Sequence, residues 1–386
     1  MERKTPLYFS FNFLVYGINC LFITFMPLYL GGMFSTDLVG IIMAGTAVAS
    51  FLAPFIWGWV FDSVKSRNNA FMLIMVISAA IYSLIGVSDS FVYLLLSCFA
   101  FMFFACSFSP VVDAVTIEFC DRTGHKYGPP RIAGTVGFAV LSLGISYLIE
   151  SVSLFMIFIV MSVLIIFNLR LLPQSGSEGV RGRREKRPSR VGHFLRNKKA
   201  VTMLFTCFAA NLTHSFFMYF FPIYLTSSEG GLGASDSVWG WVTFFFVLSE
   251  IPFFLFFDKL LKRFPLRNIS FVVVLLALIR SVTIGTVVNM PVLLAVTCVT
   301  GGVSTAAWYC AAYYLAYIST PDSRATAQTL TQTLGIQLPR VVAALTGALV
   351  ISKISFTSTM LYIGGGLNLL CCLSFLVLPV PKEKIK

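Results

Sequence analysis

The chain has 386 residues, of which 57% are hydrophobic and only 11% are charged, and its net charge is +12. A soluble domain has about 25% charged residues, so this composition excludes an ordinary soluble protein and indicates an integral membrane protein. The nine cysteines lie mostly inside apolar runs with no Cys-x-x-Cys pair, which is typical of buried thiols and not of a disulfide framework.

Twelve apolar runs follow one another along the chain, each long enough to cross about 30 Å of hydrocarbon, which takes roughly 20 helical residues. We expect all twelve to be helices, because lipid offers no hydrogen-bonding partner to an exposed strand edge. Their predicted bounds are 6–30, 38–61, 70–88, 91–119, 131–149, 152–172, 200–225, 237–257, 268–288, 291–318, 325–351 and 356–379. The predicted fold class is all-α integral membrane, with twelve transmembrane helices in two pseudo-symmetric six-helix bundles.

The basic residues predict the orientation. If both termini lie in the cytoplasm, nearly all of the 28 Lys and Arg residues fall in cytoplasmic segments, as the positive-inside rule requires. We therefore expect a multi-pass protein of a bacterial inner or plasma membrane with both termini cytoplasmic. The positive charge is then a topology signal, so we expect no nucleic-acid partner; the expected partners are a small-molecule substrate and the lipid bilayer, and the expected state is a monomer.

The two halves of the chain resemble each other. The first run ends in "MPLYL" and the seventh in "FPIYL", and "FDSVKSRN" after the second run matches "FDKLLKRF" after the eighth. Each of the latter pair places an acid and an arginine five residues apart, Asp62 with Arg67 and Asp258 with Arg263. The predicted domains are an N-terminal bundle (1–172), a basic cytoplasmic linker (173–199) and a C-terminal bundle (200–386), which is the layout of a carrier with a binding site between its halves.

These features identify a resemblance to the major facilitator superfamily over essentially the full length. "GWVFDSVKSR" (58–67) is similar to the signature loop of that family, although the usual Gly-Arg-Arg portion is replaced. "SPVVDAVTIE" followed by "YGPPRIAGTVGF" resembles the fourth and fifth helices of the oligosaccharide/nucleoside–proton symporter branch, which includes lactose-permease-like and phenylpropionate-permease-like proteins. The resemblance implies that Asp113 and Arg131 form a substrate or gating pair, that Phe138 replaces a sugar-stacking Trp, and that Arg280 is the buried arginine of the ninth helix.

Charged residues inside apolar runs are costly and usually have a partner or a function. Asp113 is either half of a structural ion pair with Arg131 or a substrate-binding, gating or proton-coupling group, and both interpretations stay open. Glu118 lies within a turn of the cytoplasm and is expected to be interfacial, near Arg122.

Four further embedded residues form the rest of the candidate site. Glu250 is a carboxylate deep in the eighth run and a candidate for reversible protonation, with a buried pair to an arginine as the alternative. Arg280 and Arg340 cannot shed their protons, so each needs an anion, either an acidic side chain or the substrate. His214 is either a hydrogen-bonded core residue or a proton-coupling group, since imidazole exchanges its proton near neutral pH.

The remaining candidates are uncharged or lie at helix ends. Asn12, Asn211 and Trp308 either bind substrate or join helices. Asp62, Arg67, Asp258 and Arg263 are either helix-end charges or, as the resemblance implies, a latch that gates the carrier. Pro110, Pro252 and Pro339 stand near the embedded charges and permit kinks.

The function expected from these residues is proton-coupled uptake of a small organic solute by alternating access. An organic or aromatic acid is favoured, because the embedded arginines suit a carboxylate; a sugar or nucleoside symporter and a proton-driven drug exporter are the alternatives. Span five has no proline in its glycine-rich stretch, which disfavours the exporter. No nucleophile–base arrangement, phosphate loop or metal-ligand spacing appears, so we expect no enzyme and no metal or cofactor, with protons as the coupling ion.

Overall fold

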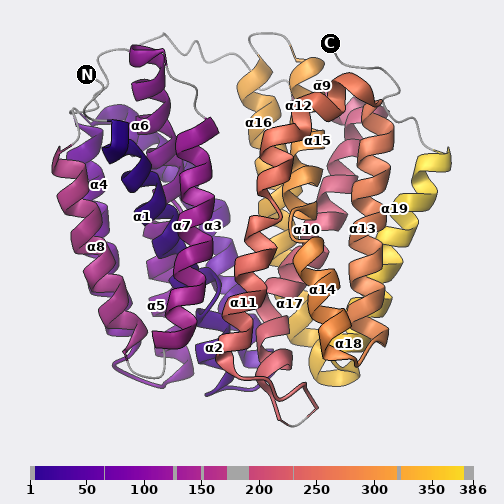
Figure 1. The fold of residues 1–386 in the computed structure, drawn as a ribbon, viewed down its shortest axis with the longest axis horizontal. Helices are drawn as coiled ribbons and strands as arrows, with labels where there is room; N and C mark the ends of the chain where they lie inside the picture. The colour runs from indigo at the N-terminus through magenta and orange to yellow at the C-terminus, as the bar shows by residue number, and fades with distance from the viewer. Residues whose placement is uncertain are drawn as a thin grey trace. The chain divides into compact units, whose positions relative to one another are not determined.

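The computed structural model describes residues 5–64, 66–124, 128–148, 152–171, 191–228, 230–319 and 323–377. Within these ranges every regular element is a helix and no β-strand occurs (Figure 1). The helices of the first half are α1 (Thr5–Ile23), α2 (Met26–Gly31), α3 (Thr36–Ser63), α4 (Arg67–Ile85), α5 (Phe91–Ala105), α6 (Phe108–Thr123), α7 (Gly128–Leu148) and α8 (Leu154–Leu171).

The second half continues in the same way with α-helices and two π-helical segments. These elements are α9 (Val191–Arg196), α10 (Lys198–Thr226), α11 (Asp236–Leu248), α12 (Ile251–Arg263), α13 (Leu266–Thr286), α14 (Met290–Val299), α15 (Val303–Tyr317), α16 (Arg324–Gln332), η4 (Thr333–Gln337), α17 (Leu338–Ile354), α18 (Phe356–Thr359), η5 (Met360–Gly365) and α19 (Gly366–Val377).

Eleven helical stretches in the described ranges are long and apolar enough to cross a membrane, and α8 adds a shorter apolar helix. Each of the twelve predicted runs coincides with one of these stretches, so the predicted all-α membrane fold is confirmed. Large apolar side chains such as Leu73, Val163 and Val299 lie exposed on the helices, as expected of a surface that faces lipid.

Four of the predicted spans are each built from two successive helices. The interruptions fall at 24–25, 106–107, 249–250 and 300–302. Pro27 and Pro252 lie in the first turns of α2 and α12, where a missing N–H costs nothing. The prediction that prolines mark bends near the embedded charges therefore agrees with the helix start at Pro252.

The two π-helical segments widen the helix locally in spans eleven and twelve. In an α-helix the N–H of residue 339 would bond the carbonyl of Gly335, but Pro339 has no N–H to give. The Cys207 thiol donates to that carbonyl instead, at 3.5 Å. Such π-bulges occur often at functional sites.

The chain divides into two compact units, each described here by itself. Unit 1 comprises Met1–Phe34, Gly45–Glu185 and Ser235–Phe244, and unit 2 comprises Ser35–Ala44, Lys186–Ala234 and Phe245–Lys386. The first part of α11 thus belongs to unit 1, where the Trp239 Nε1–H donates to the Thr24 carbonyl at 2.9 Å. The predicted linker at 173–199 lies largely outside the described residues, so the predicted domain bounds stay a prediction.

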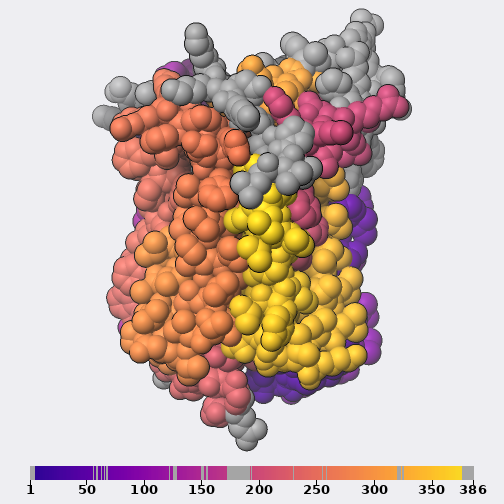
Figure 2. Space-filling view, turned by 90° about the vertical axis from the view of Figure 1, so that its right-hand side faces the viewer, coloured from indigo at the N-terminus to yellow at the C-terminus, as the bar shows by residue number. Residues whose placement is uncertain are grey.

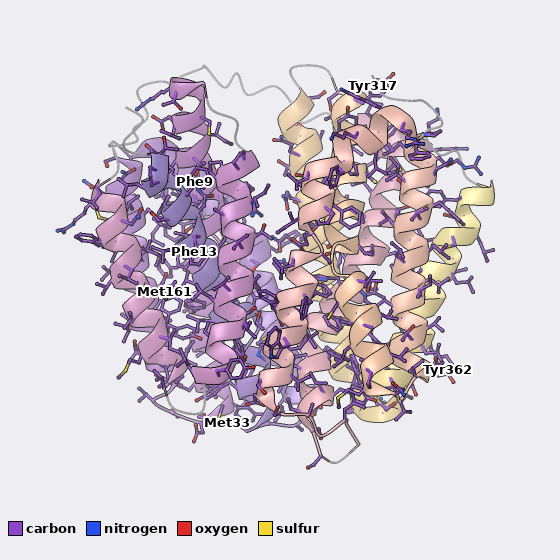
Figure 3. All side chains as sticks on the ribbon, in the orientation of Figure 1. Phe9, Phe13, Met33, Met161, Tyr317 and Tyr362 are labelled. Atoms are coloured by element: carbon purple, nitrogen blue, oxygen red, sulfur yellow. The ribbon has the colours of Figure 1, made fainter. Side chains whose placement is uncertain are left out.

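Unit 1 is organised around α1, which packs along α7 and also contacts α6 and α8. A glycine makes the α1–α7 contact close: a Cβ atom on Gly137 would collide with the carbonyl of Phe13, which is labelled in Figure 3. Small residues at helix contacts allow backbones to approach closely, which drives helix packing in lipid. This contact holds the polar face of α1 against α6 and α7.

Unit 2 is organised around α10, which contacts α13, α15 and α17. On the outer surface of the unit, α19 packs against α13, and both are visible in Figure 2. The side chain of Asn368 on α19 donates to Thr213 Oγ1 of α10 at 3.2 Å. The centre of α10, which carries His214 and Phe217, is therefore enclosed by helices from the rest of the unit.

Candidate functional site

A tyrosine joins the charged residues of unit 1. The Tyr16 hydroxyl of α1 donates to Asp113 Oδ1 of α6 at 2.7 Å, and the Arg131 guanidinium of α7 lies 4.0 Å from the centre of the Tyr16 ring. Arg131 also donates to Thr135 Oγ1 at 3.4 Å. Asp113 and Arg131 are thus brought to the same side chain, Tyr16, and whether they bind substrate stays a prediction.

The neighbouring predicted residues of unit 1 join helices. The Asn12 amide donates to the Tyr8 carbonyl at 2.9 Å and to Thr116 Oγ1 of α6 at 2.8 Å, while its Oδ1 is buried without a partner. Phe138 lies half-buried on α7, two turns beyond Arg131. Further along α6, Glu118 forms an ion pair with Arg122, the residue near which it was expected to lie.

Arg280 is the most deeply buried charge among the described residues. Its side chain is 0% exposed, and its Nη1 donates to the backbone carbonyl of Thr300 at 3.3 Å. Nε and Nη2 are buried and have no hydrogen-bond partner in the described part of the chain. These two nitrogens form one edge of the guanidinium, the edge that binds a carboxylate through two parallel hydrogen bonds.

Helix ends explain how this charge is held. Thr300 caps the C-terminus of α14, where the helix dipole leaves a partial negative charge on the last carbonyls. The interruption at 300–302 therefore supplies a favourable field for Arg280 and a carbonyl that accepts from both Arg280 and the Val303 N–H, the latter at 3.2 Å.

The interruption in span eight meets the one in span ten. Ser249 Oγ accepts a hydrogen bond from the Gly302 N–H at 2.8 Å and donates to the Phe246 carbonyl at 2.7 Å. A Cβ atom on Gly301 would collide with that same Phe246 carbonyl, so glycine is required for the contact. Glu250 follows directly in the chain and is half-buried at the start of α12.

Aromatic rings surround the Arg280 guanidinium. Its carbon Cζ lies 5.7 Å from the ring centre of Phe217 and 5.8 Å from that of Phe246, both distances typical of cation–π contact. The two rings stack on each other with centres 5.2 Å apart and planes 15° apart. The His214 ring stacks on Phe246 with ring centres 5.5 Å apart, and its buried Nδ1 has no hydrogen-bond partner among the described residues.

A second arginine reaches the same place. Both Arg280 and Arg340 act electrostatically on His214, and Arg340 acts on Tyr219 as well. Arg340 is half-buried in the first turn of α17, directly after Pro339 and the π-helical segment η4. Within unit 2 the structure therefore brings His214 and Arg280 to the same ring, Phe246, and leaves Arg340 within electrostatic range of His214.

Other predicted residues lie apart from this cluster or outside what is described. The Asn211 amide donates to the Cys207 carbonyl of its own helix at 2.9 Å, and Trp308 Nε1 is buried without a partner. Arg263 is exposed at the end of α12. The side chains of Asp62, Arg67 and Asp258 lie outside the described residues, so the predicted gating latch stays a prediction.

Several residues of the cluster were missed by sequence reasoning. Phe217 and Phe246 are two of 39 phenylalanines, and nothing in the sequence separates them from lipid-facing ones. Ser249 and Thr300 lie in runs that read as unbroken. The adjacent glycines at 301 and 302 inside span ten were the available signal of an interruption, since glycine pairs disfavour a continuous helix.

Comparison with known proteins gives both sequence and structural matches. The MFS_1 like family model matches residues 7–362. "Uncharacterized transporter YwbF" from Bacillus subtilis (strain 168) is 25% identical over 245 residues, which cover 60% of this chain and 57% of that protein's length. "Maltose permease" from Geobacillus stearothermophilus is 25% identical over 301 residues, covering 72% of this chain and 70% of that one.

Among solved structures, the nucleoside transporter NupG matches with a TM-score of 0.82 and 15% sequence identity, covering 96% of this chain and 98% of that chain. At this level of identity the match demonstrates a shared fold.

Proposed function

We propose that this protein takes up a small organic acid together with a proton. The chain belongs to the MFS_1 like family of the major facilitator superfamily and is a multi-pass secondary transporter. The observation that carries the proposal is the unpartnered edge of Arg280, which is formed by Nε and Nη2. A fully buried guanidinium with unpartnered Nε and Nη2 is expensive unless an anion binds there. A substrate carboxylate has the charge and the geometry for that edge.

The surroundings of Arg280 favour an acid with an aromatic or apolar body. Phe217 and Phe246 line the guanidinium and are both buried. An apolar group attached to the carboxylate would pack against these two rings instead of remaining in water. This supports an aromatic monocarboxylate within the wider class of organic acids.

Proton coupling is supported by the titratable residues near this edge. His214 stacks on the Phe246 ring, which the Arg280 guanidinium also faces. Glu250 lies four residues after Phe246, at the interruption between α11 and α12. A proton taken up with the anion would cancel its charge, so that the loaded carrier reorients without moving net charge. The transport cycle would be alternating access, in a monomer of the inner membrane with cytoplasmic termini.

A sugar or nucleoside is the second candidate substrate. One observation favours it: the 25% identity to a protein named maltose permease. Within unit 1, the Asn12–Thr116 and Tyr16–Asp113 hydrogen bonds form a polar cluster of the kind that binds hydroxyl groups. The same uptake experiment separates the two candidates.

The test uses the full chain in proteoliposomes with labelled 3-phenylpropionate, benzoate, maltose and uridine. We expect an inward proton gradient to drive accumulation of a carboxylate, and a protonophore to abolish it. Because weak acids also cross lipid in their neutral form, the control is an equal preparation of Arg280→Gln together with protein-free liposomes.

Accumulation of maltose or uridine instead would overturn the acid proposal in favour of the second candidate. Carboxylate uptake that is unaffected by the proton gradient would refute the coupling. Normal uptake by Glu250→Gln would remove that residue, but not His214, from the proton path.

A further inference from the structure

We infer that His214 takes up the coupled proton only after an organic anion has bound at Arg280. The inference rests on the proposed function, because it concerns the same anion site, and it adds an order of events that the family and the substrate class do not specify. It is carried by the arrangement of His214, Phe246, Arg280 and Arg340 within unit 2.

The imidazole and the guanidinium share one aromatic ring. The His214 ring stacks on Phe246 with centres 5.5 Å apart and planes 25° apart, and Arg280 Cζ lies 5.8 Å from the centre of the same ring. Phe246 is 2% exposed and Arg280 is 0% exposed, while His214 is half-buried, so the charge on Arg280 is screened by less water than a surface charge would be. A charge on either group is therefore felt by the other.

Within the described residues, two arginines act on His214 from the surrounding helices. Arg280 comes from α13 and Arg340 from α17, and both act electrostatically on the imidazole. On its own helix, Tyr219 also lies within reach of Arg340. From the interruption between α11 and α12, Glu250 is the acid closest along the chain to Phe246, and it is the competing candidate for the proton.

In the empty carrier these charges oppose protonation of His214. A third positive charge close to two guanidinium groups is unfavourable, both through repulsion and through partial loss of hydration. In the described part of the chain, Nδ1 of His214 has no hydrogen-bond partner that would stabilise a bound proton. In the order we infer, His214 is neutral in the empty carrier.

A bound carboxylate reverses that balance. On the open Nε and Nη2 edge of Arg280 it would neutralise the nearer guanidinium and place a negative charge beside the imidazole. An adjacent anion favours imidazolium. The anion and the proton then bind cooperatively, each strengthening the other by the same factor.

This order has a consequence for coupling. A proton has no stable site at His214 without the anion, so the carrier does not transport protons alone. The anion without a proton leaves a net charge that must be moved across the membrane. Both partial reactions are disfavoured by the same four side chains, and tight symport follows.

The experiment measures proton uptake that accompanies anion binding to the purified full chain in detergent. Calorimetric titrations with 3-phenylpropionate and benzoate are run between pH 6 and 8 in two buffers of different ionisation enthalpy, with 3-phenylpropanamide as the uncharged probe. For the wild type we expect uptake of about one proton per carboxylate bound. The affinity for the carboxylate should fall about tenfold for each unit by which the pH rises, in the range where His214 is protonated only in the bound state. The amide should take up no proton.

The variants assign the proton. His214→Gln should bind the carboxylate with the weaker affinity that the wild type has at high pH, with no proton uptake and a flat pH dependence, while Glu250→Gln should keep the proton uptake. Melting curves of each variant show whether it is folded, and His214→Asn provides a second removal of the imidazole.

Binding by the wild type with no proton uptake would overturn the order while leaving the proposed function intact. Proton uptake that persists in His214→Gln, or that disappears in Glu250→Gln alone, would also overturn it. If neither carboxylate binds the wild type, the proposed function fails, and this inference fails with it.

Discussion

Units 1 and 2 hold their arginines in different ways. In unit 1, Arg131 lies over the Tyr16 ring, and the same tyrosine donates to the carboxylate of Asp113. In unit 2, Arg280 has two phenylalanine faces and one backbone carbonyl, and one edge of its guanidinium is unpartnered. Unit 1 thus brings opposite charges to one side chain, whereas unit 2 holds a buried positive charge at which we propose that an anion binds.

The largest effect is expected at the open edge. Arg280→Gln removes the positive charge and the paired Nε and Nη2 donors of the unpartnered edge. Loss of a buried charge-assisted contact to a ligand costs about 2–5 kcal/mol. We expect carboxylate uptake to fall at least about thirtyfold. The matched control is Arg267→Gln on the same helix, because Arg267 lies in the first turn of α13 and donates to the Phe375 carbonyl at 3.0 Å. Equal loss in both variants would mean that α13 tolerates no change, and would not support an anion site.

The next effect concerns the packing that holds Tyr16 in place. A side chain on Gly137 would collide with the Phe13 carbonyl, so Gly137→Val must push α1 away from α7. Overpacking of this kind typically costs about 1–3 kcal/mol, which should appear as a lower melting temperature in detergent. Gly144→Val on the same helix is the control, because a Cβ atom at Gly144 meets nothing within 4 Å. Equal melting temperatures for the two variants would contradict the close α1–α7 contact.

A smaller effect is expected from the phenol of unit 1. Tyr16→Phe keeps the ring beneath Arg131 but removes the hydrogen bond to Asp113. A hydrogen bond to a charged group contributes about 1.5–3 kcal/mol, so we expect transport to fall about tenfold. Discrimination between the carboxylate and its amide should persist, because Arg280 sets it. Tyr93→Phe, which loses an exposed bond to the Leu84 carbonyl, is the control. Loss of discrimination in Tyr16→Phe would place the anion site in unit 1.

The smallest effect is expected at Glu118. Its ion pair with Arg122 is within one helix turn, and the two side chains are 21% and 55% exposed. Exposed pairs of this kind contribute about 0.3–0.5 kcal/mol, so Glu118→Gln should leave uptake unchanged and stability nearly so. A severe loss of transport would mean that Glu118 belongs to the site together with Asp113.

The sequence was sufficient to predict the fold because its signal is physical and repeated. Each span is an apolar run of fixed minimum length, and lipid permits only helices there. Interruptions inside the spans were harder to predict, since an apolar run at 291–318 does not reveal that the backbone breaks at 300–302. Only the adjacent glycines indicated it.

The candidate site was predicted in the same uneven way. His214, Arg280 and Arg340 were found because a charge or a histidine in an apolar run is costly and therefore conspicuous. The rings of Phe217 and Phe246 were not found, because their role depends on which helix faces meet, and phenylalanine is equally suited to lipid and core. The position of Tyr16 between Asp113 and Arg131 depends on the close α1–α7 contact, which the sequence alone does not reveal.

Equilibrium binding of 3-phenylpropionate and 3-phenylpropanamide to the wild type and to Arg280→Lys is the most direct test of the anion site at Arg280. Lysine keeps the positive charge but loses the two-pronged edge. We expect the wild type to bind the carboxylate and not the amide, and Arg280→Lys to bind the carboxylate at least about tenfold more weakly, a difference of about 1.4 kcal/mol. Equal affinity of the wild type for carboxylate and amide, or an unchanged carboxylate affinity in Arg280→Lys, would contradict an anion site at the open edge of Arg280.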